Sequence, residues 1–238
     1  MFCSRRVLFG ILLASHSLFA AMSEESAEFD GITVRYKVIV PKDYDPAKEY
    51  PAVLAFPGGA QTLPMVDGMI SRNNLRSQGE KRGYIVIVAS APYAGLFYKG
   101  GAAVFPAFLE KLLSDYKVRG RKFHIAGMSN GGLSAFHIAA SYPKYFWSVT
   151  GFPGYLIDAT PERISALRGM CLNMHVGELD PGWAETMQGQ AATFRAQGMK
   201  VRFTIEKGQT HVMTTLEGPG AARLFDQFDE AAHGCAAQ

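Results

Sequence analysis

The sequence predicts an α/β fold with a mostly parallel central sheet and helices on both faces. Short apolar segments alternate along the chain with stretches in which apolar residues recur at helical spacing. Residues 52–56 and 84–89 are apolar at almost every position, which is typical of parallel strands buried on both faces. No repeat or linker divides the 238 residues, so we predict one domain over residues 22–238.

The first half of the chain is expected to supply one outer strand and two inner strands. Residues 22–28 are polar, and we expect them to form a flexible lead-in. Residues 32–40 alternate between apolar and polar side chains, which predicts an antiparallel strand with one exposed face. A helix is expected to fill much of 66–82 and to end at Gly83, between the strands at 52–56 and 84–89.

The second half continues the same alternation. An aromatic and glycine-rich loop at 92–101 leads into a helix with an apolar stripe at 105–116. The remaining expected elements, in chain order, are a strand at 122–126, a helix that Pro143 ends, a strand at 146–151, a loop with a short helix at 151–169, a strand at 172–176, a helix closed by Gly198, an edge strand at 201–206 and a helix beginning near Pro219.

The N-terminus predicts export. Arg5 and Arg6 precede an apolar run from Val7 to Ala14, so we interpret residues 1–21 as a signal peptide and expect a secreted or periplasmic protein. The run is too short for a membrane span, and no stable membrane insertion is expected after its removal. Removing residues 1–21 lowers the formal charge from +3 to +1, and no basic face stands out, which argues against a nucleic-acid partner.

Cysteine usage agrees with export. Cys3 would leave with the signal peptide, so only Cys171 and Cys235 remain, and in an exported protein they are expected to pair. Cys171 begins a predicted strand and Cys235 follows the last helix, which places both away from the carboxyl ends of the strands. Two free thiols are the alternative.

The most informative segment is Gly127-Met128-Ser129-Asn130-Gly131-Gly132, between a predicted strand and a predicted helix. A G-x-S-x-G sequence in this setting is typical of a nucleophile elbow, which exposes the serine at the top of a sheet. Side chains at Gly127 and Gly131 would collide with the neighbouring strand and helix. The backbone N–H of Asn130 then lies at a helix start, where negative charge is stabilised.

An acid and a base follow the serine at the ends of later strands. Asp180 comes after the strand at 172–176, and His211 lies in the loop after the strand at 201–206. Because ligands bind at the carboxyl ends of parallel strands, Ser129, Asp180 and His211 are predicted to meet as nucleophile, acid and base. Glu178 and Asp158 are the alternative acids. The other histidines lie in predicted strands or helices, the signal peptide or the tail: His16, His124, His137, His175 and His233.

The turn after strand 52–56 is the second part of the predicted site. An oxyanion hole needs two backbone donors, and we expect Asn130 to supply one and Gly59 or Ala60 the other. With Phe56-Pro57-Gly58-Gly59, Gly177-Glu178-Leu179-Asp180 and Thr210-His211, the elbow resembles secreted α/β-hydrolase esterases, and the polyhydroxybutyrate depolymerase and feruloyl esterase group above all. The resemblance spans residues 30–230. The family's oxyanion turn often reads His-Gly, and Pro57 replaces that histidine here.

This resemblance implies a carboxylic ester hydrolase that forms an acyl-enzyme and needs no metal or cofactor. In this fold a cap is commonly inserted after the strand at 146–151, and only residues 152–170 are available for one. We therefore expect an open site for an ester carried by a bulky or polymeric substrate. Loop aromatic residues expected to surround it are Tyr93, Phe97, Tyr98, Phe152, Tyr155 and Trp183, with Trp183 the foremost substrate contact. The alternatives are a serine peptidase of the prolyl-oligopeptidase type and a hydrolase-like domain that only binds.

Overall fold

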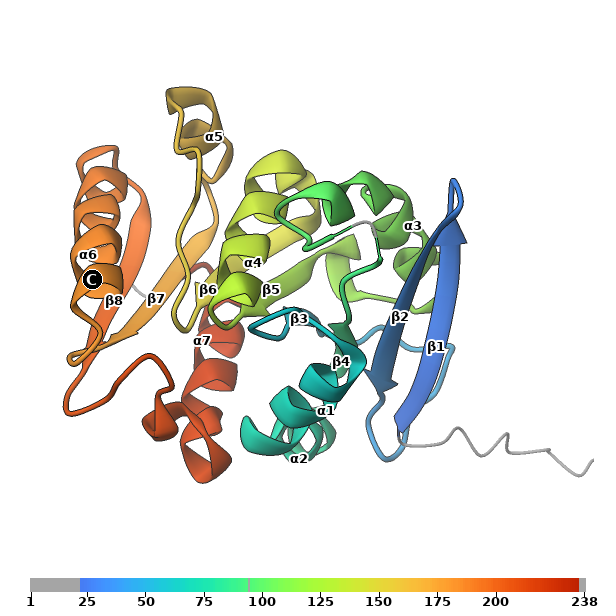
Figure 1. Ribbon diagram of the computed structural model, residues 1–238. Helices are drawn as coiled ribbons and strands as arrows, with labels where there is room; N and C mark the ends of the chain where they lie inside the picture. Colours follow the sequence, from blue (N-terminus) through green and yellow to red (C-terminus); the bar gives the residue numbers. More distant parts are fainter. Residues whose placement is uncertain (1–21, 94, 236–238) are drawn as a thin grey trace, which may run out of the picture.

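The computed structural model describes residues 22–93 and 95–235 (Figure 1). The predicted signal peptide at 1–21 lies outside these residues. The described chain forms one eight-stranded sheet in the order β1-β2-β4-β3-β5-β6-β7-β8. Among the described residues, no helix has both the length and the apolar character needed to cross a membrane.

The six strands from β4 to β8 in this order run parallel, which confirms the mostly parallel sheet. Their inner members are fully apolar or nearly so and are buried along their whole length, as their composition predicts. The strands are β2 (Ile32–Ile39), β3 (Ala52–Phe56), β4 (Ile85–Ala89), β5 (Phe123–Gly127), β6 (Phe146–Gly151), β7 (Cys171–Gly177) and β8 (Lys200–Glu206).

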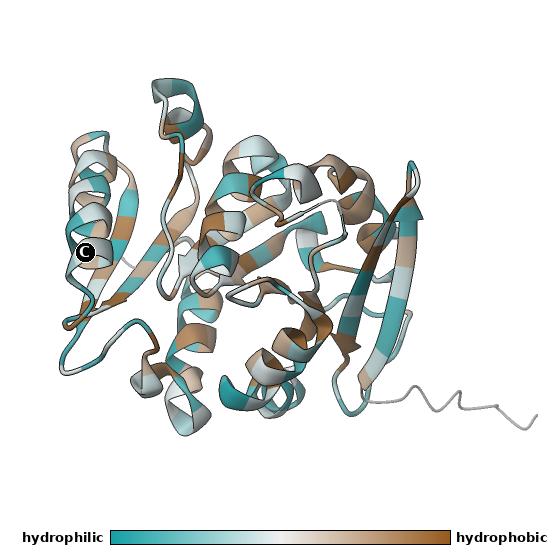
Figure 2. Ribbon diagram, in the orientation of Figure 1, coloured by the Kyte–Doolittle hydropathy of each residue, from teal (hydrophilic) through white to brown (hydrophobic). Residues whose placement is uncertain are grey.

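The expected flexible lead-in is wrong, because residues 22–29 form the edge strand β1 (Met22–Phe29). β1 pairs residue by residue with β2 in an antiparallel hairpin, which Asp30 and Gly31 close with positive φ angles of 50° and 79°. An Asp-Gly turn with two left-handed residues matches the twist of a hairpin. Figure 2 shows hydrophilic and hydrophobic residues alternating along this hairpin, as expected for a sheet edge with one wet face.

Helices cover both faces and enclose two separate apolar clusters. One cluster packs α3 (Ala107–Asp115), α4 (Asn130–Ser141), α5 (Pro161–Ala166) and α6 (Pro181–Ala196) against the sheet. The other packs α1 (Leu63–Arg72), α2 (Leu75–Arg82) and α7 (Ala222–Ala232) against the opposite face. Figure 1 shows this division, with α1, α2 and α7 together on one side.

The single helix expected at 66–82 is two helices. Asn74 adopts a left-handed conformation with φ 47°, and the amide nitrogen of the Asn73 side chain donates to the carbonyl of Leu216 at 3.0 Å. Asparagine tolerates the left-handed conformation at position 74, and the Asn73 side chain is held by a distant segment, so α1 ends and α2 begins here. Gly83 closes α2 with φ 73°, as expected.

Cys171 and Cys235 form a disulfide, with Cα atoms 5.6 Å apart. Cys171 is the first residue of β7 and Cys235 follows α7. The disulfide therefore fastens the C-terminal segment to the amino end of the parallel strands. Ser129, Asp180 and His211 follow the carboxyl ends of the strands, at the opposite edge of the sheet from this disulfide.

Candidate active site

Ser129 lies on a tight turn between β5 and α4, with φ 55° and ψ −121°. This conformation is strained for a residue with a side chain, and strain of this kind concentrates at functional sites. A Cβ on Gly127 would lie 2.1 Å from the carbonyl oxygen of Gly131, and one on Gly131 would lie 2.0 Å from that of Phe56. The expected collisions are confirmed, and the turn can form only with glycine at both positions.

The structure brings Ser129, His211 and Asp180 into one chain of hydrogen bonds. His211 Nδ1 lies 2.6 Å from Asp180 Oδ2, and His211 Nε2 lies 2.8 Å from Ser129 Oγ. An ionised carboxylate only accepts, so Nδ1 carries the proton that Asp180 binds. In the neutral imidazole Nε2 is then free to accept from the serine hydroxyl. The His211 side chain is 37% exposed and that of Asp180 17% exposed, so the serine end of the chain faces solvent.

The alternative acids lie elsewhere. Asp158 is exposed, and its charge acts on His137, whose pKa burial and Arg163 lower. Glu178 is also exposed, and its Oε2 accepts from the backbone of Gly208 at 2.9 Å. Glu178 therefore secures the loop that leads to His211 without touching the imidazole.

The other described histidines are structural by position. His124 is buried in β5, where its Nδ1 is 2.9 Å from Ser148 Oγ, and burial lowers its pKa to about 3. His175 is buried in β7. Of the histidines that the structure describes, only His211 contacts Ser129 and Asp180.

The loops that carry Asp180 and His211 are joined to each other through their backbones. The carbonyl oxygen of Glu206 accepts from the amides of Glu178 and Gln209 at 3.0 and 3.2 Å, and the amide of Leu179 donates to Gln209 at 2.8 Å. A Cβ on Gly177 would lie 2.1 Å from the carbonyl oxygen of Thr210, so the two loops touch. Asp180 and His211 therefore share one backbone support.

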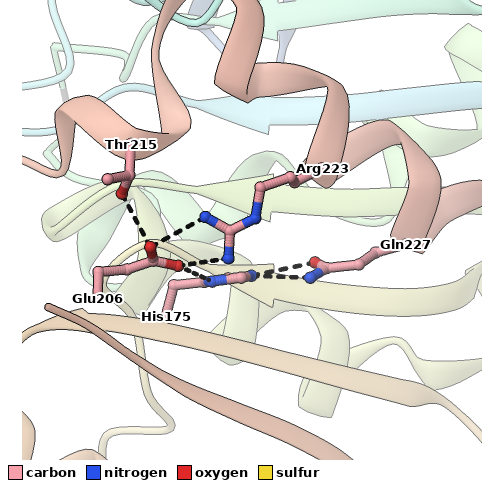
Figure 3. A network of polar contacts seen from close by, with 5 residues as sticks. All are labelled: His175, Glu206, Thr215, Arg223 and Gln227. Carbon is pink, nitrogen blue, oxygen red and sulfur yellow. Dashed lines mark hydrogen bonds and ion pairs between the residues drawn. The ribbon is translucent and has the colours of Figure 1, made fainter.

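The side chain of Glu206 organises a polar network beneath this support, buried at Glu206 and His175 and reaching the surface at Thr215 and Arg223 (Figure 3). Its carboxylate accepts from His175 Nδ1, from Thr215 Oγ1 and from both terminal nitrogens of Arg223, all at 2.8–2.9 Å. Burial raises the pKa of the Glu206 carboxyl, but these hydrogen bonds and the charges of the partners outweigh burial and hold it well below its usual value. The network joins β7, β8, α7 and the 3-10 turn at Thr214–Leu216.

The turn after β3 faces the start of α4. Gly59 and Ala60 are the central residues of a turn that the Gln61 amide closes onto Gly58 at 3.1 Å. The Asn130 side chain donates through Nδ2 to the carbonyl of Gly59 at 2.8 Å and accepts from the hydroxyl of Tyr98 at 3.2 Å. The predicted oxyanion residues thus lie next to each other, and Asn130 links them through its side chain.

Gln61 was not predicted, although it fixes this turn. It is fully buried with φ 53°, donates to Ser134 Oγ at 3.1 Å and accepts from the Phe97 amide at 3.2 Å. Its position directly after Gly-Gly-Ala is the only signal in the sequence, and a glutamine there gives no indication of burial.

The predicted substrate-contacting aromatic residues fall into two groups. The Trp183 ring centroid lies 5.0 Å from that of His211 and 5.1 Å from that of Tyr155, so these two aromatics flank the site. Phe97 is fully buried, with its ring centroid 4.8 Å from that of Phe56. It belongs to the core, so the prediction that it contacts the substrate is wrong. Phe152 is buried in the other apolar cluster, and Tyr93 is fully exposed.

No three His, Cys, Asp or Glu side chains are grouped as metal ligands within residues 22–93 and 95–235.

No protein-family model matches the sequence, and no curated protein matches it significantly. Solved structures do match its fold. A ferulic acid esterase superposes with a TM-score of 0.71 at 16% identity, over 89% of this chain and 98% of that one. A feruloyl esterase module from Clostridium thermocellum superposes with a TM-score of 0.64 at 16% sequence identity, over 80% of this chain and 81% of that one.

A thermostable esterase gives a TM-score of 0.70 at 18% identity, over 87% of this chain. This chain spans only 63% of that esterase. All three are ester hydrolases, and at these identities the likeness shows the fold. The chain has the α/β-hydrolase fold of this esterase group, with eight strands and a single layer of helices on each face.

Proposed function

We propose that this protein is a serine hydrolase that cleaves carboxylic esters through an acyl-enzyme intermediate. The observation that carries the proposal is the series of hydrogen bonds from Asp180 through His211 to Ser129, at 2.6 and 2.8 Å. A serine is activated when a base lies within hydrogen-bond distance and a third group orients that base. The fold shared with esterases supports the same chemistry.

In this mechanism Ser129 Oγ attacks the ester carbonyl while His211 Nε2 takes the hydroxyl proton. Asp180 holds the imidazole in the required tautomer and stabilises the imidazolium. The carbonyl oxygen gains negative charge, which the amide of Asn130 and one amide of the Gly59-Ala60 turn would bind. The alcohol then leaves with the proton from His211. A water that His211 deprotonates releases the acid from Ser129.

The alcohol portion is proposed to be bulky or polymeric. Only residues 152–170 separate β6 from β7, and α5 is the one helix among them. His211 is 37% exposed, and Trp183 and Tyr155 present aromatic rings beside it. An open site with aromatic walls accommodates a large group that an enclosed pocket would exclude.

The first experiment measures initial rates on p-nitrophenyl acetate, butyrate and octanoate, with Ser129→Ala as control. Activity on at least one ester that the variant loses would establish a serine esterase. No activity on any ester from folded protein would refute the proposal. Cleavage of aminoacyl amides would then indicate a peptidase, and failure to react with an active-serine probe would indicate a domain that only binds.

We also propose that the protein acts outside the cytoplasm, in the periplasm or after secretion. The disulfide supports this location, because such bonds persist in oxidising compartments. Expression with residues 1–21 intact, followed by cell fractionation and N-terminal sequencing, tests it. Recovery of a chain that begins near residue 22 in the periplasm or medium is expected, whereas uncleaved protein in the cytosol would contradict it.

A further inference from the structure

We infer that a methionine-lined pocket beside the oxyanion turn binds the acyl chain of the substrate and selects short, linear aliphatic acyl groups. The inference rests on the proposed function and adds its acyl specificity. The pocket has a volume of about 140 Å³. The residues that carry the argument are Met65, Met69, Met128, Gly58, Gly59 and Arg72, and we call this cavity the methionine pocket.

One wall of the methionine pocket, formed by Gly58, lies beside Ser129. A Cβ on Gly58 would lie 3.5 Å from the Cβ of Ser129 and 3.0 Å from the Cε of Met128. A Cβ on Gly59 would lie 2.8 Å from the Cε of Met65. The turn that faces the elbow is therefore also a wall of the pocket. A carbonyl held at this turn has one of its two substituents at the pocket entrance.

Three methionines from two elements supply the apolar lining. Met65 and Met69 lie one turn apart on α1, and Met128 comes from the elbow itself. Met69 is 3% exposed and Met65 is 37% exposed, so the pocket has a fixed side and an open side. Unbranched thioether side chains adapt to flexible aliphatic groups better than branched ones. The polar lining from Arg72 and Asn73 limits the apolar length available.

The volume sets the size of the acyl group. At about 140 Å³ the pocket is small, so we infer that it takes an acyl chain of only a few carbons. Butyryl and hexanoyl chains are therefore the expected best substrates, and the last carbons of an octanoyl chain are expected to gain little.

The position of His211 decides which half of the ester enters the pocket. The leaving alcohol takes its proton from His211 Nε2, so the alcohol must lie on the His211 side of Ser129. Trp183 stacks edge-on to His211 there, at 5.0 Å between ring centroids. Within the described chain, no residue of α6 or of the loop carrying His211 lines the methionine pocket. The acyl group is left as its occupant.

Two substrate series test the inference. One keeps p-nitrophenol as the alcohol and varies the acyl chain from acetate to octanoate, and the other keeps acetate and varies the alcohol from methyl to hexyl. Met65→Phe fills the open side of the pocket and should lower kcat/KM for butyrate and hexanoate about tenfold relative to acetate. Met65→Ala should move the optimum to a longer acyl chain. Both variants should leave the ranking of alcohols unchanged.

Two further variants act as references. Trp183→Ala should change the alcohol series and leave the ranking of acyl chains unchanged. Ile205→Phe adds the same aromatic bulk at a 44% exposed position on β8, outside the pocket, and should change neither series. Circular dichroism and thermal melting verify that each variant is folded.

The outcomes separate this inference from the proposed function. If the wild-type protein hydrolyses no ester in either series, the proposed function fails and the acyl assignment fails with it. If it hydrolyses esters but Met65→Phe changes the alcohol ranking, the pocket holds the alcohol and the inference is overturned. Equal effects of Met65→Phe and Ile205→Phe on the acyl series would also overturn it while leaving the esterase intact.

Discussion

Glu206 and Arg223 form a bidentate ion pair beneath the loop that carries His211. Arg223 Nη1 lies 2.9 Å from Glu206 Oε2, and Arg223 Nη2 lies 2.8 Å from Glu206 Oε1. The Glu206 side chain is 6% exposed and the Arg223 side chain 43% exposed. The pair is fixed to β7 by His175 and to the 3-10 turn by Thr215.

Removing the charge of Glu206 should lower stability. Glu206→Gln leaves Arg223 without its carboxylate, which should cost about 2–3 kcal/mol, less than for a fully buried pair because Arg223 reaches solvent. Urea unfolding measures the loss. Glu230→Gln is the matched control. The Glu230 side chain is 43% exposed and that of its partner Arg202 is 27% exposed, so this ion pair should contribute less than about 1 kcal/mol. Equal losses from both substitutions would contradict a special role for Glu206.

Stability should depend on pH through the same carboxylate. The pKa of Glu206 is lowered in the folded protein, so the unfolded chain takes up the proton first as the pH falls. The stabilisation is fully present above the ordinary carboxyl pKa of 4.5 and is lost progressively below it. Unfolding free energies at pH 7, 5, 4 and 3 should therefore show the gap between wild type and Glu206→Gln narrowing below pH 4.5. A gap that stays constant over this range would rule out the linkage.

Substitutions in the proposed catalytic triad should remove activity and spare the fold. Ser129→Ala and His211→Ala should each lower kcat by about 10⁴-fold or more, and Asp180→Asn by a comparable but smaller factor. Initial rates on the best p-nitrophenyl ester measure the effect. Asp158→Asn is the control, because that exposed carboxylate lies near His137 and away from His211. A larger loss from Asp158→Asn than from Asp180→Asn would reverse the assignment of the acid.

Two glycine-to-alanine substitutions should have opposite effects on stability. Gly131→Ala places a Cβ 2.0 Å from the backbone of Phe56, so it should displace the elbow, abolish activity and lower the melting temperature. Gly189→Ala lies in α6 with no atom within 4 Å of the added Cβ, and should stabilise the protein by about 0.5–1 kcal/mol. Melting temperatures and ester hydrolysis of the two variants provide the comparison. An active Gly131→Ala protein would contradict this prediction, because it would mean that the turn can move away from the Phe56 carbonyl without displacing Ser129.

Reducing the disulfide should affect stability alone. The bond joins residues 64 apart in sequence, and its loss should cost about 2–4 kcal/mol. Cys171→Ser, or wild type with dithiothreitol, should melt at a lower temperature, and dithiothreitol should have no effect on the variant. Hydrolysis of a small ester at 25 °C should stay near the wild-type rate, since the disulfide lies at the amino end of β7. A large loss of rate in folded Cys171→Ser would show that the disulfide also positions the site.

The parts of the molecule that depend on local chemistry could be predicted from the sequence. The inner strands β3 and β4 are apolar at every position, and the elbow has glycine at the two places where a Cβ collides with backbone. The order Ser129, Asp180, His211 then follows from which strand each residue comes after. These features need no knowledge of distant contacts, which is why the sequence reveals them.

Features that depend on pairing across the fold could not be predicted. The lead-in at 22–28 is polar because β1 is an edge strand, and only its register with β2 identifies it as a strand. Glu206 is polar at the end of an alternating strand, which normally indicates an exposed side chain. It is buried because His175, Thr215 and Arg223 reach it from three other segments, and no local pattern encodes that meeting.

The hydrogen bond between Asn130 Nδ2 and the carbonyl of Gly59 joins segments 71 residues apart in sequence. The two proposed oxyanion donors are therefore held at a fixed spacing before any substrate arrives. Water dipoles would have to reorient around a developing negative charge, at a cost paid in every turnover. In the proposed mechanism that reorganisation is completed once, when the chain folds, so each catalytic cycle would begin with the donors already oriented.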